Sequence, residues 1–473
     1  MLRSTQQTVA AQPLPLEERY LLFEKNARAA FAEYPQAEPL RLLVFKQLLV
    51  QRRVDGWKGQ VKRWIRPLLK RSRTRLGAGR SDVLIWLETE REVIREALLP
   101  VYNELRAREI GTELVSIYGA RNLPMAARVF EFPARAGAPQ WARGAWETLC
   151  NGDQELRDKA LERSFYHACA MLQGLYDELE RLLDSVRPKV VLCASTTAFG
   201  GGALMVAARR RGIASLLLQH GMPGPEMSSC TADSIIVWGP SSAESLLSLG
   251  FPQARMITAG SPRHDAMRPS SHGRARAILR EALGIAGQQP TLVFFSQGHD
   301  LERHAEAATE SVRWLERTAL RYAGAVNVVV RLHPCESGSL YSGCRSLKVM
   351  DRAVDLAIAL DGCDCVSSLS STVLYDGLLY GKPAWQFSAD GWPVLAENWR
   401  KGLAVRVSSE RQLHEMVGGM LAEREAGDVD RTLIGRVFAN HGRATQAVAD
   451  VVEKQLAADQ FLAQSQAACD RSC

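Results

Sequence analysis

Short apolar runs alternate with helical stretches along most of the chain, and this alternation limits the fold more than any other feature. The runs end at turn residues, and the segments between them repeat apolar residues at helical spacing. We expect strands at residues 82–87, 113–117, 188–193, 213–218, 234–238, 255–259, 291–295, 326–332, 347–350, 363–366, 384–387 and 403–407. Strands that alternate with helices form parallel sheets with right-handed crossovers. The pattern therefore predicts an α/β protein whose two halves are each doubly wound.

The length of the chain predicts more than one domain, because 473 residues exceed the size at which single cores stop growing. The most suitable linker is the polar stretch 268–273, which contains proline, serine and glycine. We predict four segments. They are a basic helical N-terminal extension (1–80), an N-terminal Rossmann-like domain (81–268), a C-terminal Rossmann-like domain (269–440) and a C-terminal helical tail (441–473).

The composition, 46% apolar and 23% charged, is ordinary for a globular protein in water. No apolar run approaches the ~20 residues that span a bilayer, and the first residues lack the apolar core of a secretory signal. The ten cysteines follow no zinc or disulfide spacing. We therefore expect a cytoplasmic protein with reduced thiols.

The net charge of +7 comes from one segment, residues 51–80, which contains eleven basic residues and one acid. An apolar stripe accompanies the charge at helical spacing, formed by Trp57, Val61, Trp64, Leu68 and Leu69. Such a helix suits an anionic membrane surface, where each basic residue adds about 1 kcal/mol. A solvated helix that packs its tryptophans on the next domain explains the pattern equally well. Nucleic-acid binding ranks well behind, because no nucleic-acid fold accompanies the patch.

Two histidine motifs and a run of hydroxyl residues follow predicted strands. Gln219-His220-Gly221 follows 213–218, Leu332-His333-Pro334 ends 326–332, and the hydroxyl run 367–372 follows 363–366. Ligands of open parallel sheets bind at the carboxyl ends of the strands. The three motifs together predict an enzyme that binds the phosphate of a nucleotide-activated donor.

The residues predicted to hold the donor phosphate are His333 and the helix start at Ser370, Ser371 and Thr372. Backbone N–H groups at a helix start favour an anion, although the same residues are also ordinary N-caps. An imidazole at His333 can donate a hydrogen bond to a phosphate and balance the charge of a leaving group, or it can merely end a strand. Arg331 either adds positive charge to this site or forms a salt bridge under the sheet.

His220 is the predicted general base. Transfer to a hydroxyl acceptor removes a proton, and an imidazole has a pKa near the working pH. Gly221 lets the backbone turn without a Cβ atom, so that a ligand can approach closely.

The chain resembles the bacterial CDP-glycerol glycerophosphotransferases and the capsule-type glycosyltransferases, and it shares the His-Pro and Ser-Ser/Thr pair with polysialyltransferases and Kdo transferases. The resemblance covers roughly residues 189–387. It rests on Gln219-His220-Gly221, Gly260-Ser261-Pro262-Arg263-His264-Asp265, Arg331-Leu332-His333-Pro334, and Ser370-Ser371-Thr372 with Asp376. It implies a GT-B architecture, in which two doubly wound Rossmann-type domains face each other across a cleft.

The resemblance also implies roles for single residues. A histidine is required at the His-Gly position, here His220, and an acidic residue at Asp376 faces the donor sugar or ribose. Gln297 ends the first strand of the second domain, where GT-B enzymes meet the nucleotide. Several related transferases instead use an acidic base in the first domain, for which Glu88 and Glu226 are the reserve candidates.

Two further sequence features bear on the mechanism. Gly200-Gly201-Gly202 fits neither a dinucleotide fingerprint nor a Walker A loop, and we interpret it as close packing of a loop against a helix. No convincing Asp-x-Asp loop is present, so we expect a mechanism without metal or cofactor.

We therefore predict a transferase that moves a sugar or glycerol-phosphate unit from a CMP- or CDP-linked donor to a lipid-linked or growing surface glycan. The alternatives are a UDP-sugar 2-epimerase-like enzyme and a non-catalytic nucleotide- or glycan-binding relative. An anionic membrane surface is a further expected partner, and nucleic acid is not.

Overall fold

The computed structural model describes residues 16–41, 44, 80–88, 92–116, 128–129, 137–151, 157, 159–196, 199–224, 227, 230–270, 273–297, 305–333, 336–351, 353–392, 397–422 and 431–469. Except for Arg80, the basic segment 51–80 lies outside these residues, and so does Glu226. The proposals that involve them stay predictions.

The first sheet has seven strands in the order β3-β2-β1-β4-β5-β6-β7. The strands are β1 (Val83–Leu87), β2 (Thr112–Ser116), β3 (Arg128–Val129), β4 (Val190–Cys193), β5 (Ala214–Leu218), β6 (Ser234–Val237) and β7 (Met256–Thr258). β1 pairs in parallel with β2 on one side and with β4 on the other. The order therefore reverses between β1 and β4, which is the switch point of a doubly wound sheet.

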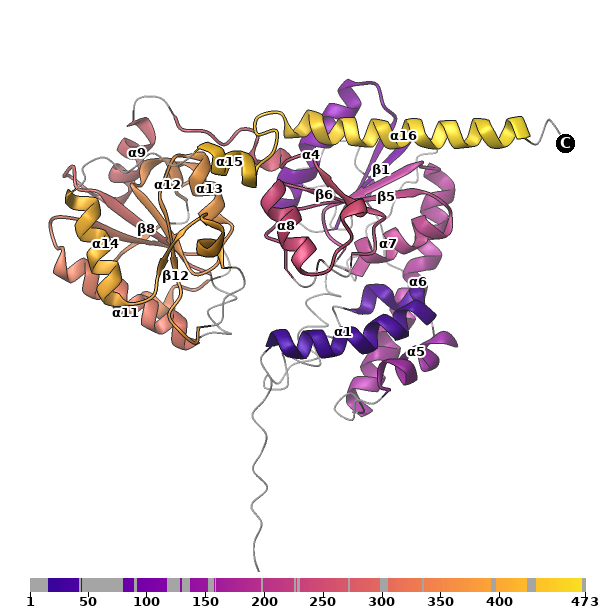
Figure 1. Cartoon of the computed structure of the whole chain (residues 1–473), viewed down its shortest axis with the longest axis horizontal. Helices are drawn as coiled ribbons and strands as arrows, with labels where there is room; N and C mark the ends of the chain where they lie inside the picture. Colours follow the sequence, from indigo (N-terminus) through magenta and orange to yellow (C-terminus); the bar gives the residue numbers. More distant parts are fainter. Residues whose placement is uncertain are drawn as a thin grey trace, which may run out of the picture. The chain divides into compact units, whose positions relative to one another are not determined.

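The second sheet has six strands in the order β10-β9-β8-β11-β12-β13. They are β8 (Thr291–Phe295), β9 (Asn327–Arg331), β10 (Lys348–Met350), β11 (Cys365–Ser368), β12 (Ala384–Phe387) and β13 (Val405–Val407). β8 pairs in parallel with β9 and with β11, so the switch point of this sheet lies between β8 and β11. Figure 1 shows both sheets with their covering helices.

Helices connect the strands. They are α1 (Leu16–Glu33), α4 (Glu92–Ala107), α5 (Trp141–Leu149), α6 (Lys159–Val186), α7 (Phe199–Arg210), α8 (Pro240–Ser248), α9 (Arg274–Leu283), α11 (Ala305–Arg321), α12 (Leu356–Gly362), α13 (Val373–Leu379), α14 (Glu410–Ala422), α15 (Arg431–Val437) and α16 (Ala444–Cys469). Short 3-10 turns include η1 (Pro35–Leu40), η7 (Pro262–His264), η9 (Ser339–Tyr341) and η10 (Asn398–Lys401). No helix among the described residues is both long and apolar enough to cross a membrane.

The expected α/β architecture is confirmed, and each of the twelve predicted strands is present with its ends within two residues. Three details differ. The two-residue strand β3 and the helix α5 were not predicted, and Gly200-Gly201-Gly202 forms the first turn of α7 instead of a loop before it.

By internal contacts the chain divides into two compact units. The first comprises Met1–Leu218, Pro225–Ile235 and Ala449–Cys473, and the second comprises Gln219–Gly224 and Ile236–Val448. The predicted four-segment division of the chain stays a prediction.

In the first unit, α1 packs against α5, and the 3-10 turn η1 that follows it packs against α6 and α7. α1 buries Phe23, Ala27 and Phe31, and Tyr176 of α6 donates a hydrogen bond to the Gln36 carbonyl at 2.9 Å. The C-terminal helix α16 lies beside α4, where Arg108 forms ion pairs with Asp450 and Glu453 (Figure 1). The ends of the described chain are therefore part of this unit.

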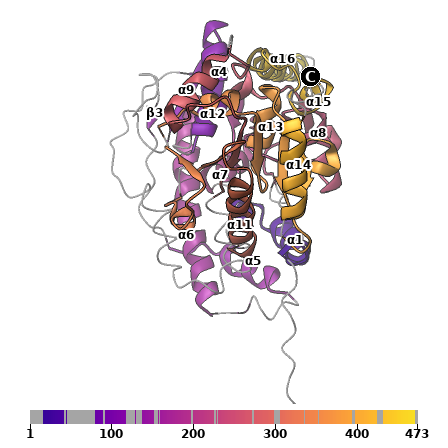
Figure 2. The ribbon, with the colours of Figure 1, turned by 90° about the vertical axis from the view of Figure 1, so that its left-hand side faces the viewer.

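In the second unit, apolar layers cover both faces of the sheet. Residues of α9, α12, α13 and α15 pack on one face, together with Trp238 and Phe438. Residues of α11 and α14 pack on the other face, and these two helices lie side by side in Figure 2. Polar residues lie at the carboxyl ends of the strands, beyond these two apolar layers.

Candidate functional site

At the switch point of the second sheet, predicted site residues from β8 and β11 are in direct contact. The side-chain oxygen of Gln297, which follows β8, accepts a hydrogen bond from the backbone N–H of Ser370 at 2.6 Å. The same oxygen accepts from the Ser368 hydroxyl at 3.2 Å. Gln297 therefore fixes the loop that leads from β11 to α13.

The hydroxyl run divides into structural and accessible members. β11 extends two residues further than predicted, so Ser367 and Ser368 belong to the strand, and their hydroxyls donate to carbonyls of β8 at 3.1 Å and 2.7 Å. Ser370 is buried, whereas Ser371 and Thr372 are half-buried. Ser371 accepts from the N–H of Val373 at 3.3 Å, as expected for a residue at a helix start.

His333 is half-buried in a tight turn that follows β9. Glu336 closes this turn, because its N–H donates to the His333 carbonyl at 2.9 Å and its carboxylate accepts from the His333 N–H at 3.2 Å. The second carboxylate oxygen of Glu336 accepts from the Ser296 hydroxyl at 2.9 Å, next to Gln297. Glu336, which the sequence did not point to, thus links the end of β9 to the end of β8.

Arg331 lies at the end of β9, and its predicted contribution of positive charge to the donor site stays a prediction. Its guanidinium donates to the carbonyl of Val354, in the turn before α12, at 3.0 Å. Burial lowers the pKa of Arg331, and the nearby carboxylate of Asp355 opposes this effect. Arg331 thus connects the end of β9 to the turn before α12.

The Gln219-His220-Gly221 loop is held by the buried side chain of Gln219. This amide donates to the Gly221 carbonyl at 2.8 Å and to the Ser242 hydroxyl at 3.0 Å, and it accepts from the Trp238 N–H at 2.8 Å. The indole N–H of Trp238 donates to the Gln219 carbonyl at 2.7 Å. The loop is therefore fixed on both sides of His220, whose side chain is half-buried.

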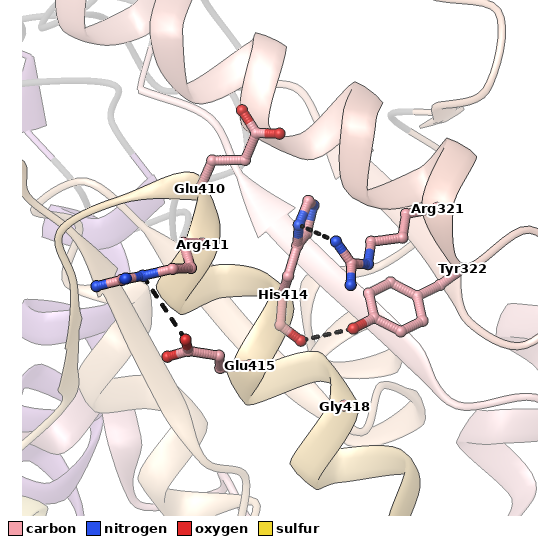
Figure 3. A pocket seen from close by; sticks show the side chains of 7 residues that line it. All are labelled: Arg321, Tyr322, Glu410, Arg411, His414, Glu415 and Gly418. Carbon is pink, nitrogen blue, oxygen red and sulfur yellow. Dashed lines mark hydrogen bonds and ion pairs between the residues drawn. The ribbon is translucent and has the colours of Figure 1, made fainter.

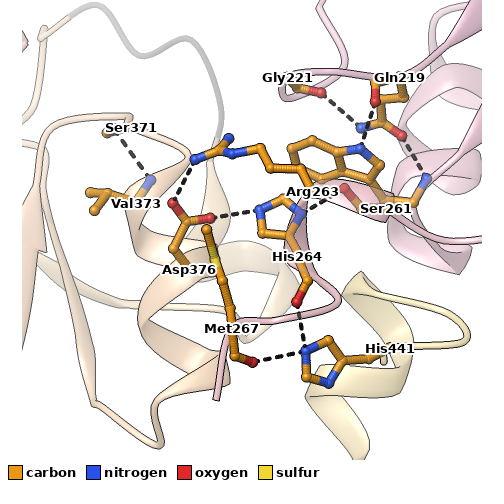
Figure 4. A network of polar contacts seen from close by, with 11 residues as sticks. Gln219, Gly221, Ser261, Arg263, His264, Met267, Ser371, Val373, Asp376 and His441 are labelled. Atoms are coloured by element: carbon orange, nitrogen blue, oxygen red, sulfur yellow. Dashed lines mark hydrogen bonds and ion pairs between the residues drawn. The ribbon is translucent and has the colours of Figure 1, made fainter. Parts of the chain in front are cut away.

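A buried polar network joins the 261–265 segment to α13 (Figure 4). The Nδ1 atom of His264 lies 2.6 Å from the Ser261 hydroxyl, and the Nε2 atom lies 2.9 Å from a carboxylate oxygen of Asp376. Arg263 reaches the other oxygen of Asp376 at 3.4 Å. Ser261, His264 and Asp376 are each at most 3% exposed.

Burial and hydrogen bonding have opposite effects on the protonation of His264. Burial lowers the pKa of His264, although the hydrogen bond to Asp376 opposes this, so the ring is neutral at neutral pH. A carboxylate accepts but does not donate, so we assign the proton to Nε2 and the acceptor role to Nδ1. The rings of Trp238 and Phe438 pack against the imidazole with centroids 5.0 Å and 4.4 Å away.

This position of Asp376 differs from what the resemblance implied. Its carboxylate is 1% exposed and bonded to His264 and Arg263, so it is neither a solvated helix residue nor open to a ligand in this structure. A direct contact between Asp376 and a donor stays a prediction.

Other residues of the 260–265 segment contact residues 439–445, which lead from α15 into the first turn of α16. Gly260 has a φ of +103°, and a Cβ atom there would overlap the carbonyl oxygen of Ala439. The carboxylate of Asp265 accepts from the N–H groups of Ala444 and Thr445, at 2.9 Å and 2.7 Å, and so caps α16. The imidazole of His441 lies 3.0 Å from the carbonyl oxygens of His264 and Met267.

Glu88 lies at the end of β1, beside the switch point of the first sheet. It is buried, and its two carboxylate oxygens accept from the N–H groups of Gly200 and Gly201 at 2.6 Å and 2.5 Å. Burial raises the pKa of Glu88 to about 7, and these hydrogen bonds oppose the increase. Glu88 therefore acts as the N-terminal cap of α7, and the choice between Glu88 and His220 as the base stays a prediction.

The three glycines of α7 fit this close contact. A Cβ atom at Gly201 would overlap the Ser195 carbonyl oxygen, and one at Gly202 would lie 2.9 Å from the Thr196 carbonyl oxygen. The glycine run is closely packed, as predicted, but it lies in the first turn of α7 and not in a loop.

A hollow on the second unit lies between the end of α11 and the start of α14 (Figure 3). It is lined by Arg321, Tyr322, Glu410, Arg411, His414, Glu415 and Gly418. Basic and acidic side chains alternate in it, and none of the predicted site residues takes part. We assign it no role in the chemistry.

No model of a known protein family matches the chain, and no curated protein matches it in sequence. Solved structures do share its fold. A UDP-GlcNAc 2-epimerase from Methanocaldococcus jannaschii, in complex with UDP-GlcNAc and UDP, superposes with a TM-score of 0.52 at 12% identity. The match covers 79% of this chain and 99% of that chain.

A UDP-GlcNAc 2-epimerase from Neisseria meningitidis, bound to UDP-GlcNAc, gives a TM-score of 0.51 at 13% identity, over 79% of this chain and 99% of that chain. The wall teichoic acid polymerase TagF, soaked with CDPG, gives a lower TM-score of 0.49 at 11% identity, over 82% and 92% of the two chains. The chain has a GT-B-like fold.

Proposed function

We propose that the protein is a GT-B-type transferase that moves a sugar or glycerol-phosphate unit from a CMP- or CDP-linked donor to a lipid-linked or growing surface glycan. The observation that carries the proposal is the contact of Gln297 with Ser370 at the switch point of the second sheet. Open α/β sheets bind their ligands at this point. Ser371 and Thr372 follow in the same loop, and Glu336 attaches His333 to the neighbouring strand end.

The proposed reaction is a direct displacement. His220 accepts the proton of the acceptor hydroxyl. At the same time, the hydroxyl oxygen forms a bond to the transferred carbon or phosphorus atom. The bond from that atom to the leaving phosphate oxygen breaks, and the electron pair leaves with the nucleotide. His333 and the hydroxyls of Ser371 and Thr372 donate hydrogen bonds to the leaving phosphate, where negative charge increases.

The roles of the two histidines can be tested with His220→Ala and His333→Ala. Donors linked to CMP, CDP and UDP are incubated with the full-length enzyme and a glycan acceptor, and nucleotide release is measured. Loss of one proton acceptor or one charge-stabilising donor lowers kcat by roughly 100-fold or more. The matched control is His414→Ala on α14, which should leave turnover unchanged. Wild-type turnover in both site variants would reject the mechanism.

A UDP-sugar 2-epimerase-like enzyme is the second candidate, because two epimerases match along 99% of their own length. The two candidates differ in their need for an acceptor. Product analysis after incubation with a UDP-sugar alone separates them, since an epimerase converts the donor without acceptor. Nucleotide binding without any turnover would instead indicate a non-catalytic relative.

A further inference from the structure

A chain of buried contacts connects the Gln219-His220-Gly221 loop to α13, and the proposed reaction assigns it no role. It starts at the Gln219 carbonyl, which accepts from the Trp238 indole at 2.7 Å. The Trp238 ring meets the His264 ring edge-on, and His264 bonds to Asp376 at 2.9 Å. Asp376 lies on α13, one turn after Thr372.

We propose that His264 and Asp376 are positioning residues that hold the His220 loop and the loop before α13 in one fixed arrangement. The inference rests on the proposed function for its kinetic test only. The members of this chain of contacts all belong to the second unit. Neither residue is accessible to a substrate, because His264 and Asp376 are 0% and 1% exposed.

Hydrogen bonding, in addition to packing, requires a histidine at position 264. An apolar ring would satisfy Trp238 and Phe438, but it would leave the Asp376 carboxylate and the Ser261 hydroxyl buried without this partner. Neutral His264 supplies one donor and one acceptor on opposite sides of the ring, which Ser261 and Asp376 use. A ring bonded at both ends cannot rotate, so the position of α13 is set relative to Trp238.

Two substitutions of His264 separate its two hydrogen bonds. In His264→Gln the terminal amide reaches the position of Nε2 and can still donate to Asp376. In His264→Asn the shorter amide reaches only the position of Nδ1 and leaves the carboxylate without this donor. We expect kcat of His264→Asn to fall by roughly 100-fold with the donor KM within about threefold, as for a misplacement of about 1 Å. His264→Gln should stay within about tenfold of the wild type.

A double-variant cycle identifies the loop through which the pair acts. If His264 positions His220, then His264→Asn should change turnover little in a His220→Ala background. The proposal would be overturned if the losses of kcat caused by His264→Asn and His220→Ala multiplied in the double variant. It would also be overturned if His264→Gln and His264→Asn lowered kcat equally. Should His220→Ala itself leave transfer unchanged, the proposed base fails, and the spectroscopic test below still decides the positioning role.

Histidine NMR of the full-length chain tests the arrangement without any substrate. In ¹⁵N-histidine-labelled protein, we expect His264 to keep its proton on Nε2 at neutral pH and to have a pKa below that of an ordinary imidazole. Asp376→Asn and the milder Ser261→Ala should shift the His220 signals, which His220→Ala assigns. The matched control is Asp364→Asn, because Asp364 pairs with Arg276 and the Thr291 N–H elsewhere in this unit. Unchanged His220 signals in the folded network variants, or the same change in the control, would overturn the proposal.

Discussion

At the scale of single residues, Gly260 shows how a backbone requirement fixes a residue type. Its φ of +103° disfavours any residue with a side chain, and a Cβ atom would also overlap Ala439. We expect Gly260→Ala to destabilise the protein by about 3 kcal/mol, from the sum of backbone strain and overpacking. Gly284 is the matched control, because its φ is +61° and nothing lies within 4 Å of an added Cβ atom.

Gly284→Ala should therefore lower the free energy of unfolding by only about 1 kcal/mol, because an alanine there must adopt the left-handed backbone conformation. Thermal unfolding of both variants measures the difference. If the two substitutions lower Tm equally, the close approach of Ala439 contributes nothing.

Glu88 gives a pH dependence whose sign follows from its burial. Its pKa is raised from 4.5 to about 7, so the folded protein binds this proton more tightly than the unfolded chain. The resulting stability is fully present below about pH 4.5 and is lost as the pH rises through 7, by roughly 3 kcal/mol in total. Glu88→Gln, which cannot ionise, should remove this contribution.

The comparison is made by measuring Tm of the wild type and Glu88→Gln from pH 5 to pH 8. We expect the difference between the two proteins to change in favour of the variant as the pH rises. A constant difference across the range would show that Glu88 does not titrate there.

At the scale of secondary-structure elements, the strands could be predicted because each is a short apolar run that ends at a turn residue. β3 contains only Arg128 and Val129, too few residues to form a pattern. The glycines 200–202 were placed in a loop because glycine disfavours helices, whereas here they allow the α7 start to approach Ser195 and Glu88. Here the close contacts with Ser195 and Glu88 outweigh the low helix propensity of glycine.

The same limit applies to the site. Gln297, His333 and Ser370 could be found because each follows a strand. The resemblance named His264 and Asp376, but their contact could not be predicted, because they are 112 positions apart and no periodicity connects them. The role of Glu336 likewise could not be predicted, because it depends on the turn after β9, which places Glu336 against Ser296.

The basic segment 51–80 supports a prediction at this scale. If it binds an anionic membrane surface, its deletion should reduce binding to vesicles that contain anionic lipid, and the wild-type binding should weaken as salt rises. Co-sedimentation with anionic and with neutral vesicles measures this. Equal binding by the full chain and by the deletion variant would reject a membrane role and favour a helix that packs on the protein.

At the scale of the whole molecule, the two switch points differ in what occupies them. In the first sheet the N–H groups at the start of α7 already bind Glu88. In the second sheet Gln297 fixes the loop through the Ser370 N–H, and the half-buried Ser371 and Thr372 follow it. We therefore expect an incoming phosphate to bind beside Ser371 and Thr372 at the second sheet rather than at the first.

This asymmetry predicts where a nucleotide stabilises the protein. CMP, CDP, UDP and GDP are compared by thermal shift, and a nucleotide at about 100 times its Kd should stabilise the wild type by ~2.7 kcal/mol. Ser371→Ala combined with Thr372→Val should reduce this stabilisation, whereas Glu88→Gln should leave it unchanged. CDP or CMP as the strongest ligand would favour the proposed transferase donor, and UDP would favour the epimerase-like candidate. Loss of the shift in Glu88→Gln alone would instead place the nucleotide at the first sheet.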